Sequence, residues 1–122
     1  MKRLLPLLFV ALTFAQATTR NVALSWTAST STGVLGYQVY RSTSSTGPFT
    51  TPLNSALVAG TSYVDSTAVI GQTYTYAVTA QGAACTPTTP VGTPCGQSPP
   101  ATATTTIPAQ PAVTVTITVT VP

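Results

Sequence analysis

Few side chains in this sequence are able to do chemistry. It holds one acidic residue, Asp65, no histidine and a single lysine, Lys2, within its first three residues. General acid–base catalysis needs positioned groups with tuned pKa values, usually in pairs, and a nucleophilic serine needs a histidine or lysine base. The two carboxylates of glycoside hydrolysis are also unavailable. We therefore predict that the protein is not an enzyme.

Residues that bind metals or cofactors are equally scarce. Calcium takes six or more oxygen ligands, and structural zinc takes four ligands supplied by cysteine and histidine. One carboxylate and two thiols satisfy neither ion, and no glycine-rich phosphate loop follows a strand. We expect no metal and no cofactor. Asp65 is predicted to be structural, with its carboxylate accepting backbone N–H bonds from Thr67 or Ala68.

Cys85 and Cys95 are the only cysteines, and they flank a proline-rich segment. An exported protein meets oxidising conditions, in which such a pair forms a disulfide. Closing a loop of this size contributes roughly 2.5–3 kcal/mol in the loop-entropy model. The bridge would staple residues 81–100, a connection longer than most. Two roles stay open for this loop: a rigid binding surface, or a stabilised insertion without a partner.

Residues 1–17 have the pattern of an export signal. Lys2 and Arg3 precede an apolar run over residues 4–14, and a small-x-small cleavage pattern follows at residues 15–17. This order predicts a secretory signal peptide. The apolar run is shorter than the roughly 20 residues of a membrane span, and a retained N-terminal anchor is the alternative.

Removal of residues 1–17 leaves three charged side chains. They are Arg20, Arg41 and Asp65, two positive and one negative, for a net charge of +1. A nucleic-acid partner needs a basic patch, and binding to a membrane surface needs a basic amphipathic helix. We therefore expect no nucleic-acid partner and no membrane insertion after cleavage. The predicted location is secreted, extracellular or in the cell envelope, the periplasm included.

The elements that position these residues are predicted to be β-strands. Hydrophobic residues make up 43% of the chain and charged residues only 4%, and no helical periodicity follows residue 17. Short alternating runs are separated by clusters of glycine, proline, serine and threonine, which is typical of an all-β sandwich. The predicted strands are residues 21–27, 36–41, 49–53, 61–66, 73–80 and 101–107.

Four blocks of the sequence, VALSW, GYQVYRS, SYVDST and GQTYTYAVTA, resemble a bacterial fibronectin type III domain over residues 21–107. The resemblance implies an immunoglobulin-like Greek-key sandwich of seven strands. It implies that Trp26 is the core tryptophan of the family's second strand. It also implies that Tyr74 is the corner tyrosine, whose hydroxyl bonds to nearby backbone.

The same resemblance sets the expected boundaries of the domain. With the signal peptide removed, the domain is expected to span residues 18–107, with Tyr37 and Tyr76 completing the aromatic core. Residues 108–111 are expected to form a stiff linker to a C-terminal strand. The chain departs from the family at Ile70, where a proline is common. Almost no sequence is left for the family's first strand, so one flank of the core is expected to lack a cover of its own.

The C-terminal strand, residues 112–122, is the surplus element. Its aliphatic residues alternate with threonine and are Val113, Val115, Ile117, Val119 and Val121. An unpaired strand of this kind invites aggregation, so it needs a partner. It either enters the uncovered flank of another copy as a donated strand, or folds back in its own chain. Folding back would place it parallel to the strand at residues 21–27, or beside the last strand.

The predicted function is a secreted, non-enzymatic module. It would act as a structural or adhesive surface protein through contacts with itself or other proteins, and self-association by the C-terminal strand would make it a homo-oligomer. The alternative is an accessory module that binds polysaccharide. That alternative relies on Tyr40 and Phe49 lying on the outer surface, where aromatic rings can stack on sugars.

Overall fold

The computed structural model describes residues 18–86, 89–109 and 115–122. The described residues form six strands and no helix. The strands are β1 (Thr19–Thr27), β2 (Gly36–Ser42), β3 (Ser62–Val69), β4 (Thr73–Gln81), β5 (Ala101–Thr106) and β6 (Val115–Thr120). Predicted signal residues 1–17, part of the predicted linker and Val113 lie outside the described residues.

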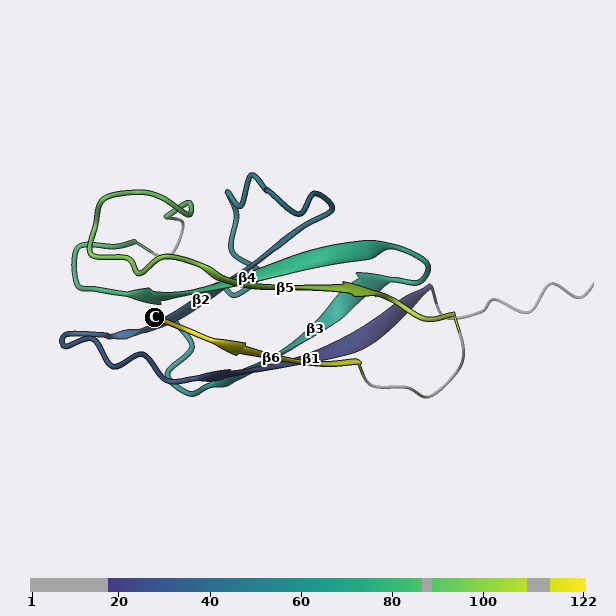
Figure 1. Ribbon diagram of the computed structural model, residues 1–122, viewed down its shortest axis with the longest axis horizontal. Helices are drawn as coiled ribbons and strands as arrows, with labels where there is room; N and C mark the ends of the chain where they lie inside the picture. Colours follow the sequence, from purple (N-terminus) through teal and green to yellow (C-terminus); the bar gives the residue numbers. More distant parts are fainter. Residues whose placement is uncertain (1–17, 87–88, 110–114) are drawn as a thin grey trace, which may run out of the picture.

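Two three-stranded sheets form the two layers of the fold. One sheet has the order β3-β1-β6 and the other the order β2-β4-β5. Figure 1 shows the layers nearly edge-on, with β2-β4-β5 above β3-β1-β6. All pairs are antiparallel except β1–β6, which is parallel. The all-β prediction is therefore confirmed, and the two layers have the arrangement of a β-sandwich.

The alternation of side chains explains which residues fill the core. In β1, Val22, Leu24 and Trp26 are buried, while Thr27 faces solvent. The Trp26 ring meets Tyr37 from the opposite sheet, with ring centroids 5.4 Å apart. Such tilted aromatic pairs add to the free energy of burial. All four predicted core aromatics are buried, and they are Trp26, Tyr37, Tyr74 and Tyr76.

One predicted strand is wrong. Residues 49–53 form no strand, and their only ladder contact is an isolated bridge between Pro52 and Tyr40. Proline has no N–H to donate, so it cannot continue a ladder. Instead, this segment lies along the edge of β2, where Leu53 N–H donates to the Val39 carbonyl at 2.7 Å.

The C-terminal strand folds back in its own chain and runs parallel to β1. The pairing begins with Val22 opposite Val115 and ends with Thr27 opposite Thr120. Along β6 and just beyond it, Ile117, Val119 and Val121 are buried. The tail of the same molecule thus fills the flank of β1 that was expected to lack a cover, and the in-chain parallel arrangement is the one found.

Candidate functional site

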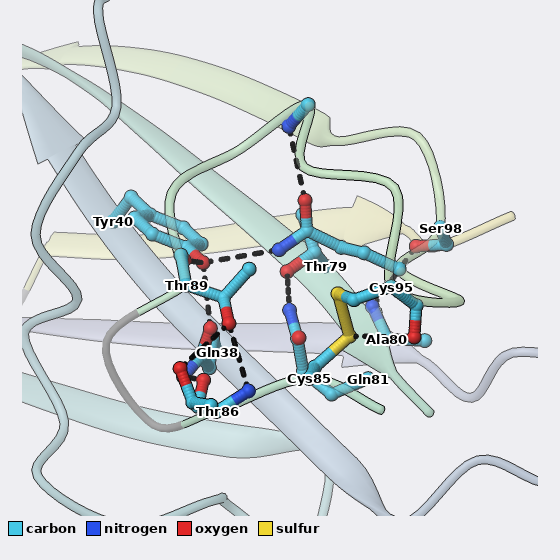
Figure 2. The surroundings of a disulfide bond; sticks show 12 residues. Gln38, Tyr40, Thr79, Ala80, Gln81, Cys85, Thr86, Thr89, Cys95 and Ser98 are labelled. Atoms are coloured by element: carbon cyan, nitrogen blue, oxygen red, sulfur yellow. Dashed lines mark hydrogen bonds between the residues drawn. A yellow bond between two sulfur atoms is a disulfide. The ribbon is translucent and has the colours of Figure 1, made fainter. Parts of the chain in front are cut away.

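The disulfide loop, predicted over residues 81–100, follows β4 and is a candidate either for a binding surface or for a stabilised insertion. Cys85 and Cys95 are bonded, with their sulfur atoms 2.08 Å apart and their Cα atoms 5.0 Å apart. Figure 2 shows the bridge beside the β2–β4 sheet. The loop is tied to β4 by a reciprocal pair of bonds, because Ser98 N–H donates to the Ala80 carbonyl and Ala80 N–H donates to Ser98 Oγ, each at 2.9 Å.

The loop covers the outer face of the β2–β4–β5 sheet and creates a second apolar cluster there. Tyr40, Phe49 and Ala77 are buried in it, and Val91 from the loop packs against them. The backbone closes the cover, since Val91 N–H donates to the Phe49 carbonyl at 3.0 Å. The alternative in which Tyr40 and Phe49 lie exposed is therefore wrong, because they are 0% and 9% exposed.

A polar layer fills the space between the loop and the sheet. The Tyr40 hydroxyl lies within hydrogen-bond distance of Gln38 Oε1, at 2.6 Å, and of the Thr89 carbonyl, and it accepts from Gln97 Nε2 at 3.2 Å. Gln38 Nε2 donates in turn to the Thr86 carbonyl at 3.1 Å. Burial raises the pKa of Tyr40, although hydrogen bonds oppose the rise. Buried polar groups that find partners in this way fix one position of a loop.

These contacts favour the structural role of the stapled loop. Tyr40 and Phe49, the two rings considered for ligand binding, are buried beneath Val91 of the loop, and Tyr40 presents no ring face to solvent. A sugar-binding platform needs exposed aromatic rings with a free face. The carbohydrate-binding alternative therefore loses the two rings on which it relied.

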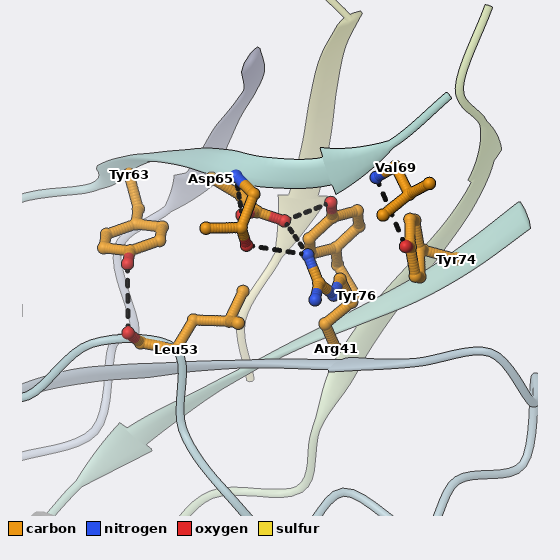
Figure 3. A network of polar contacts seen from close by, with 8 residues as sticks. Arg41, Leu53, Tyr63, Asp65, Val69, Tyr74 and Tyr76 are labelled. Carbon is orange, nitrogen blue, oxygen red and sulfur yellow. Dashed lines mark hydrogen bonds and ion pairs between the residues drawn. The ribbon is translucent and has the colours of Figure 1, made fainter. Parts of the chain in front are cut away.

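A second polar cluster, which sequence reasoning missed, joins the two sheets (Figure 3). Asp65 on β3 is 3% exposed, and its Oδ2 accepts from Arg41 Nη1 on β2 at 2.8 Å and from the Tyr76 hydroxyl on β4 at 2.6 Å. Its Oδ1 accepts the Thr67 N–H at 2.9 Å and the Thr67 hydroxyl at 2.7 Å. We call Arg41, Asp65, Thr67 and Tyr76 the inter-sheet network.

The predicted bond from Thr67 N–H is thus present, but the ion pair was not expected. A signal for it exists in the alternation of β2, since Arg41 shares the inward parity of Tyr37 and Val39. An inward cation needs an anion, because a buried unpaired charge is costly. Asp65 is the only side-chain carboxylate in the sequence.

The electrostatics of the network hold each group in one protonation state. Burial alone would raise the pKa of Asp65, but hydrogen bonds from Thr67, Tyr76 and Arg41 outweigh it and hold that pKa below its usual range. Burial, and then the bond to Asp65, raise the pKa of Tyr76 far above the ordinary value. A carboxylate that is ionised, sealed from solvent and fully bonded is poorly suited to move protons.

Tyr74 closes the same end of the sandwich. Its hydroxyl accepts the Val69 N–H at 3.3 Å, the bond expected of a corner tyrosine. The Arg41 guanidinium lies over the Tyr74 ring, with Cζ 4.5 Å from the centroid. Such cation–π contact adds about 0.5–2 kcal/mol. Arg41 is thereby held from two sides.

The four sheet edges differ in their protection. The β2 edge is covered, since Tyr37 and Val58 exchange backbone bonds at 2.9 and 3.0 Å and Val39 N–H donates to Asn54 Oδ1 at 2.9 Å. The β3 edge carries the inward-pointing Asp65. The β5 and β6 edges lie on the other side, where these two strands contact each other across the layers.

Comparison with protein-family models, with curated proteins and with solved structures finds no significant match for this chain. Within the described ranges, no helix is long and apolar enough to cross a membrane. Over the same residues, no three His, Cys, Asp or Glu side chains gather where they could hold a metal ion.

Proposed function

We propose that the chain is an exported, non-enzymatic β-sandwich module related to fibronectin type III domains, and that it acts as a structural or adhesive surface protein through protein–protein contacts. The observation that carries the proposal is the inter-sheet network. Arg41, Thr67 and Tyr76 donate four hydrogen bonds to Asp65. The single side-chain carboxylate of the sequence therefore stabilises the fold and is not free to act as an acid or base.

The family relationship is supported by three features of the fold. Trp26 is buried against the facing sheet, and the Tyr74 hydroxyl accepts a hydrogen bond from backbone five residues upstream. The chain also changes sheet at each step from β1 to β4, as in a Greek-key connection. The chain differs from that family at Ile70, where a proline is common, and at the position of the family's first strand. Its first strand is replaced by the C-terminal β6, which runs parallel to β1. Export is supported by the disulfide and by the pattern of residues 1–17.

A contact function is supported by what the strands present to solvent. Where burial is described in β5 and β6, the exposed positions are threonines, and Val64 and Val69 of β3 are 53% and 40% exposed. Uncharged strands of this kind suit association by backbone pairing and small side chains. The same surface gives a charged ligand few counter-charges to bind.

The proposal is tested by displaying the exported chain on a non-adherent cell. We expect cell–cell aggregation or adhesion to protein-coated surfaces, and no saturable binding to a glycan array. Cells that carry the empty display scaffold are the control. Glycan binding without adhesion would favour the accessory polysaccharide-binding module, and no binding of either kind would contradict the proposal.

A further inference from the structure

We propose that two copies of this chain associate through β5, which pairs antiparallel with β5 of the second copy about a two-fold axis near Thr104. The β2-β4-β5 sheet then becomes a six-stranded sheet. This inference rests on the proposed function and deepens it by naming the partner, a second copy, and the surface that binds it.

The first observation is the unequal protection of the two sides of the sandwich. Proteins guard exposed edges with covering loops, inward charges, bulges or proline. The side formed by β2 and β3 has two of these devices, the cover at residues 53–58 and the inward Asp65. Strands β5 and β6 carry neither charge nor proline, and no described segment pairs with their outer edges. The outer edges of β5 and β6 are therefore the edges at which a partner strand can pair.

The second observation is the direction of the backbone groups of β5. Thr104 lies opposite Thr75 and Thr106 opposite Thr73, and both hydroxyl pairs are 2.8 Å apart. Side chains approach most closely at the non-hydrogen-bonded positions of an antiparallel ladder. At such positions the N–H and C=O of Thr104 point away from β4, toward the free edge. Consistent with this alternation, Ile107 N–H donates to the Gln72 carbonyl on the β4 side at 2.8 Å.

The third observation is that this edge is complementary to itself. The outward residues of β5 are Thr102, Thr104 and Thr106, all exposed. An antiparallel pair centred on Thr104 places the two Thr104 residues opposite each other, and each Thr102 opposite Thr106 of the second copy. Cross-strand threonine pairs stabilise a sheet, as they already do between β4 and β5. With no charge on the strand, two copies meet without repulsion.

The position of β6 extends the contact to the second layer. Because β5 and β6 contact each other on the same side of the sandwich, the two-fold axis that joins two β5 strands also brings the two β6 edges toward each other. A two-fold contact of this kind is closed, so it yields a dimer and not a filament. One short strand pair is smaller than a standard interface of about 1,600 Å². We therefore expect weak, reversible association.

The test is sedimentation velocity of the exported, oxidised chain between about 10 μM and 1 mM, a range that spans weak dissociation constants. The chain should shift from monomer to dimer with concentration. Thr104→Pro removes one N–H from the free edge and leaves the β4 ladder bonded, so it should stay monomeric throughout. The matched control Thr104→Val loses the same hydroxyl but keeps the N–H, and it should still dimerise.

A second measurement keeps the inference testable if Thr104→Pro does not fold. Thr104→Cys should form a disulfide-linked dimer at least tenfold faster than Val64→Cys, which lies exposed on the opposite side. Equal rates, a monomeric wild type at the highest concentration, or dimers that persist in folded Thr104→Pro would each overturn the β5 interface. If Thr104→Pro is folded and monomeric and the cells that display it still adhere, β5 is rejected as the adhesive surface and the proposed function stands.

Discussion

Because of the inter-sheet network, we predict that the isosteric substitution Asp65→Asn strongly lowers the free energy of unfolding. The carboxylate accepts four hydrogen bonds from Arg41, Thr67 and Tyr76. The amide has one oxygen, so its NH₂ must face either the Thr67 N–H or the Arg41 guanidinium, and neither can accept. At least one of the four bonds is therefore abolished, the hydroxyl in contact with the NH₂ must turn to accept from it, and Arg41 loses its charged partner. Together these losses cost about 3 kcal/mol.

Two facts place this cost within expected limits. Breaking a buried ion pair by removing one partner costs about 3–5 kcal/mol. The lower end applies because the Arg41 side chain is 22% exposed and can regain water. For a domain of this size, about 3 kcal/mol lowers the Tm by roughly 12–24 °C. It is also a large part of the roughly 5–15 kcal/mol that stabilises most domains.

The assay is urea unfolding followed by the fluorescence of Trp26, the only tryptophan. Arg41→Met and the double variant with Asp65→Asn complete a thermodynamic cycle. If the two side chains act as a unit, the double variant should be at least about 1 kcal/mol more stable than the sum of the single effects predicts. Thr67→Val, which removes a hydroxyl and leaves the ion pair, is the matched control.

The same network predicts how stability depends on acid. The pKa of Asp65 is lower in the folded than in the unfolded chain, so its contribution is present above the unfolded pKa of about 4. The contribution is lost as the pH falls through the folded pKa. With no other acidic side chain and no histidine, the slope should stay near one proton, at most about 1.4 kcal/mol per pH unit.

Two results would refute this reasoning about the network. One is an Asp65→Asn variant within about 1 kcal/mol of the wild type at neutral pH, which would mean that the four bonds contribute little. The other is an unchanged acid slope in that variant, which would assign the titration to the chain terminus. Additive single effects in the cycle would show that Arg41 and Asp65 stabilise the fold independently.

Three further predictions concern the rest of the fold. Tyr76→Phe should flatten the loss of stability above about pH 10, because the raised pKa of Tyr76 keeps its proton only in the folded state, and tyrosinate absorbance measures this. Ile117→Ala should cost about 2–4 kcal/mol in urea unfolding because Ile117 is buried, whereas equal effects of Ile117→Ala and the exposed control Thr120→Ala would contradict the core role of β6. Replacing Cys85 and Cys95 by serine should cost roughly 2.5–3 kcal/mol and increase tyrosine quenching by acrylamide, and unchanged quenching would show that the loop stays closed without its bridge.

The stapled loop explains why the outer face of the β2-β4-β5 sheet is buried although it carries polar side chains. Every residue of β4 from Tyr74 to Gln81 is buried, although only alternate positions face the main core. The loop supplies the second cover, and the disulfide reduces the entropy lost when that cover closes. A binding role for the loop therefore needs groups other than Tyr40, which is fully enclosed.

Local patterns in the sequence were sufficient for much of the fold. A period of two identifies a strand and the face that it buries, and it predicts the inward positions of Trp26, Tyr37, Tyr74 and Tyr76. The Asp65 bond to Thr67 N–H was predictable because it spans two residues. The segment at residues 49–53 was the exception, where Pro52 prevented a ladder.

The tertiary structure decided what those strands and loops meet. Alternation says that Ile117 and Val119 share a face, but only the return of the chain places that face against β1. Tyr40 points away from the main core, and only the path of the stapled loop buries it. Arg41 and Asp65 lie in different sheets and meet because the layers pack. The reason is that the period of a strand is set by backbone geometry within a few residues, whereas these contacts depend on which distant segments bury the most apolar surface together.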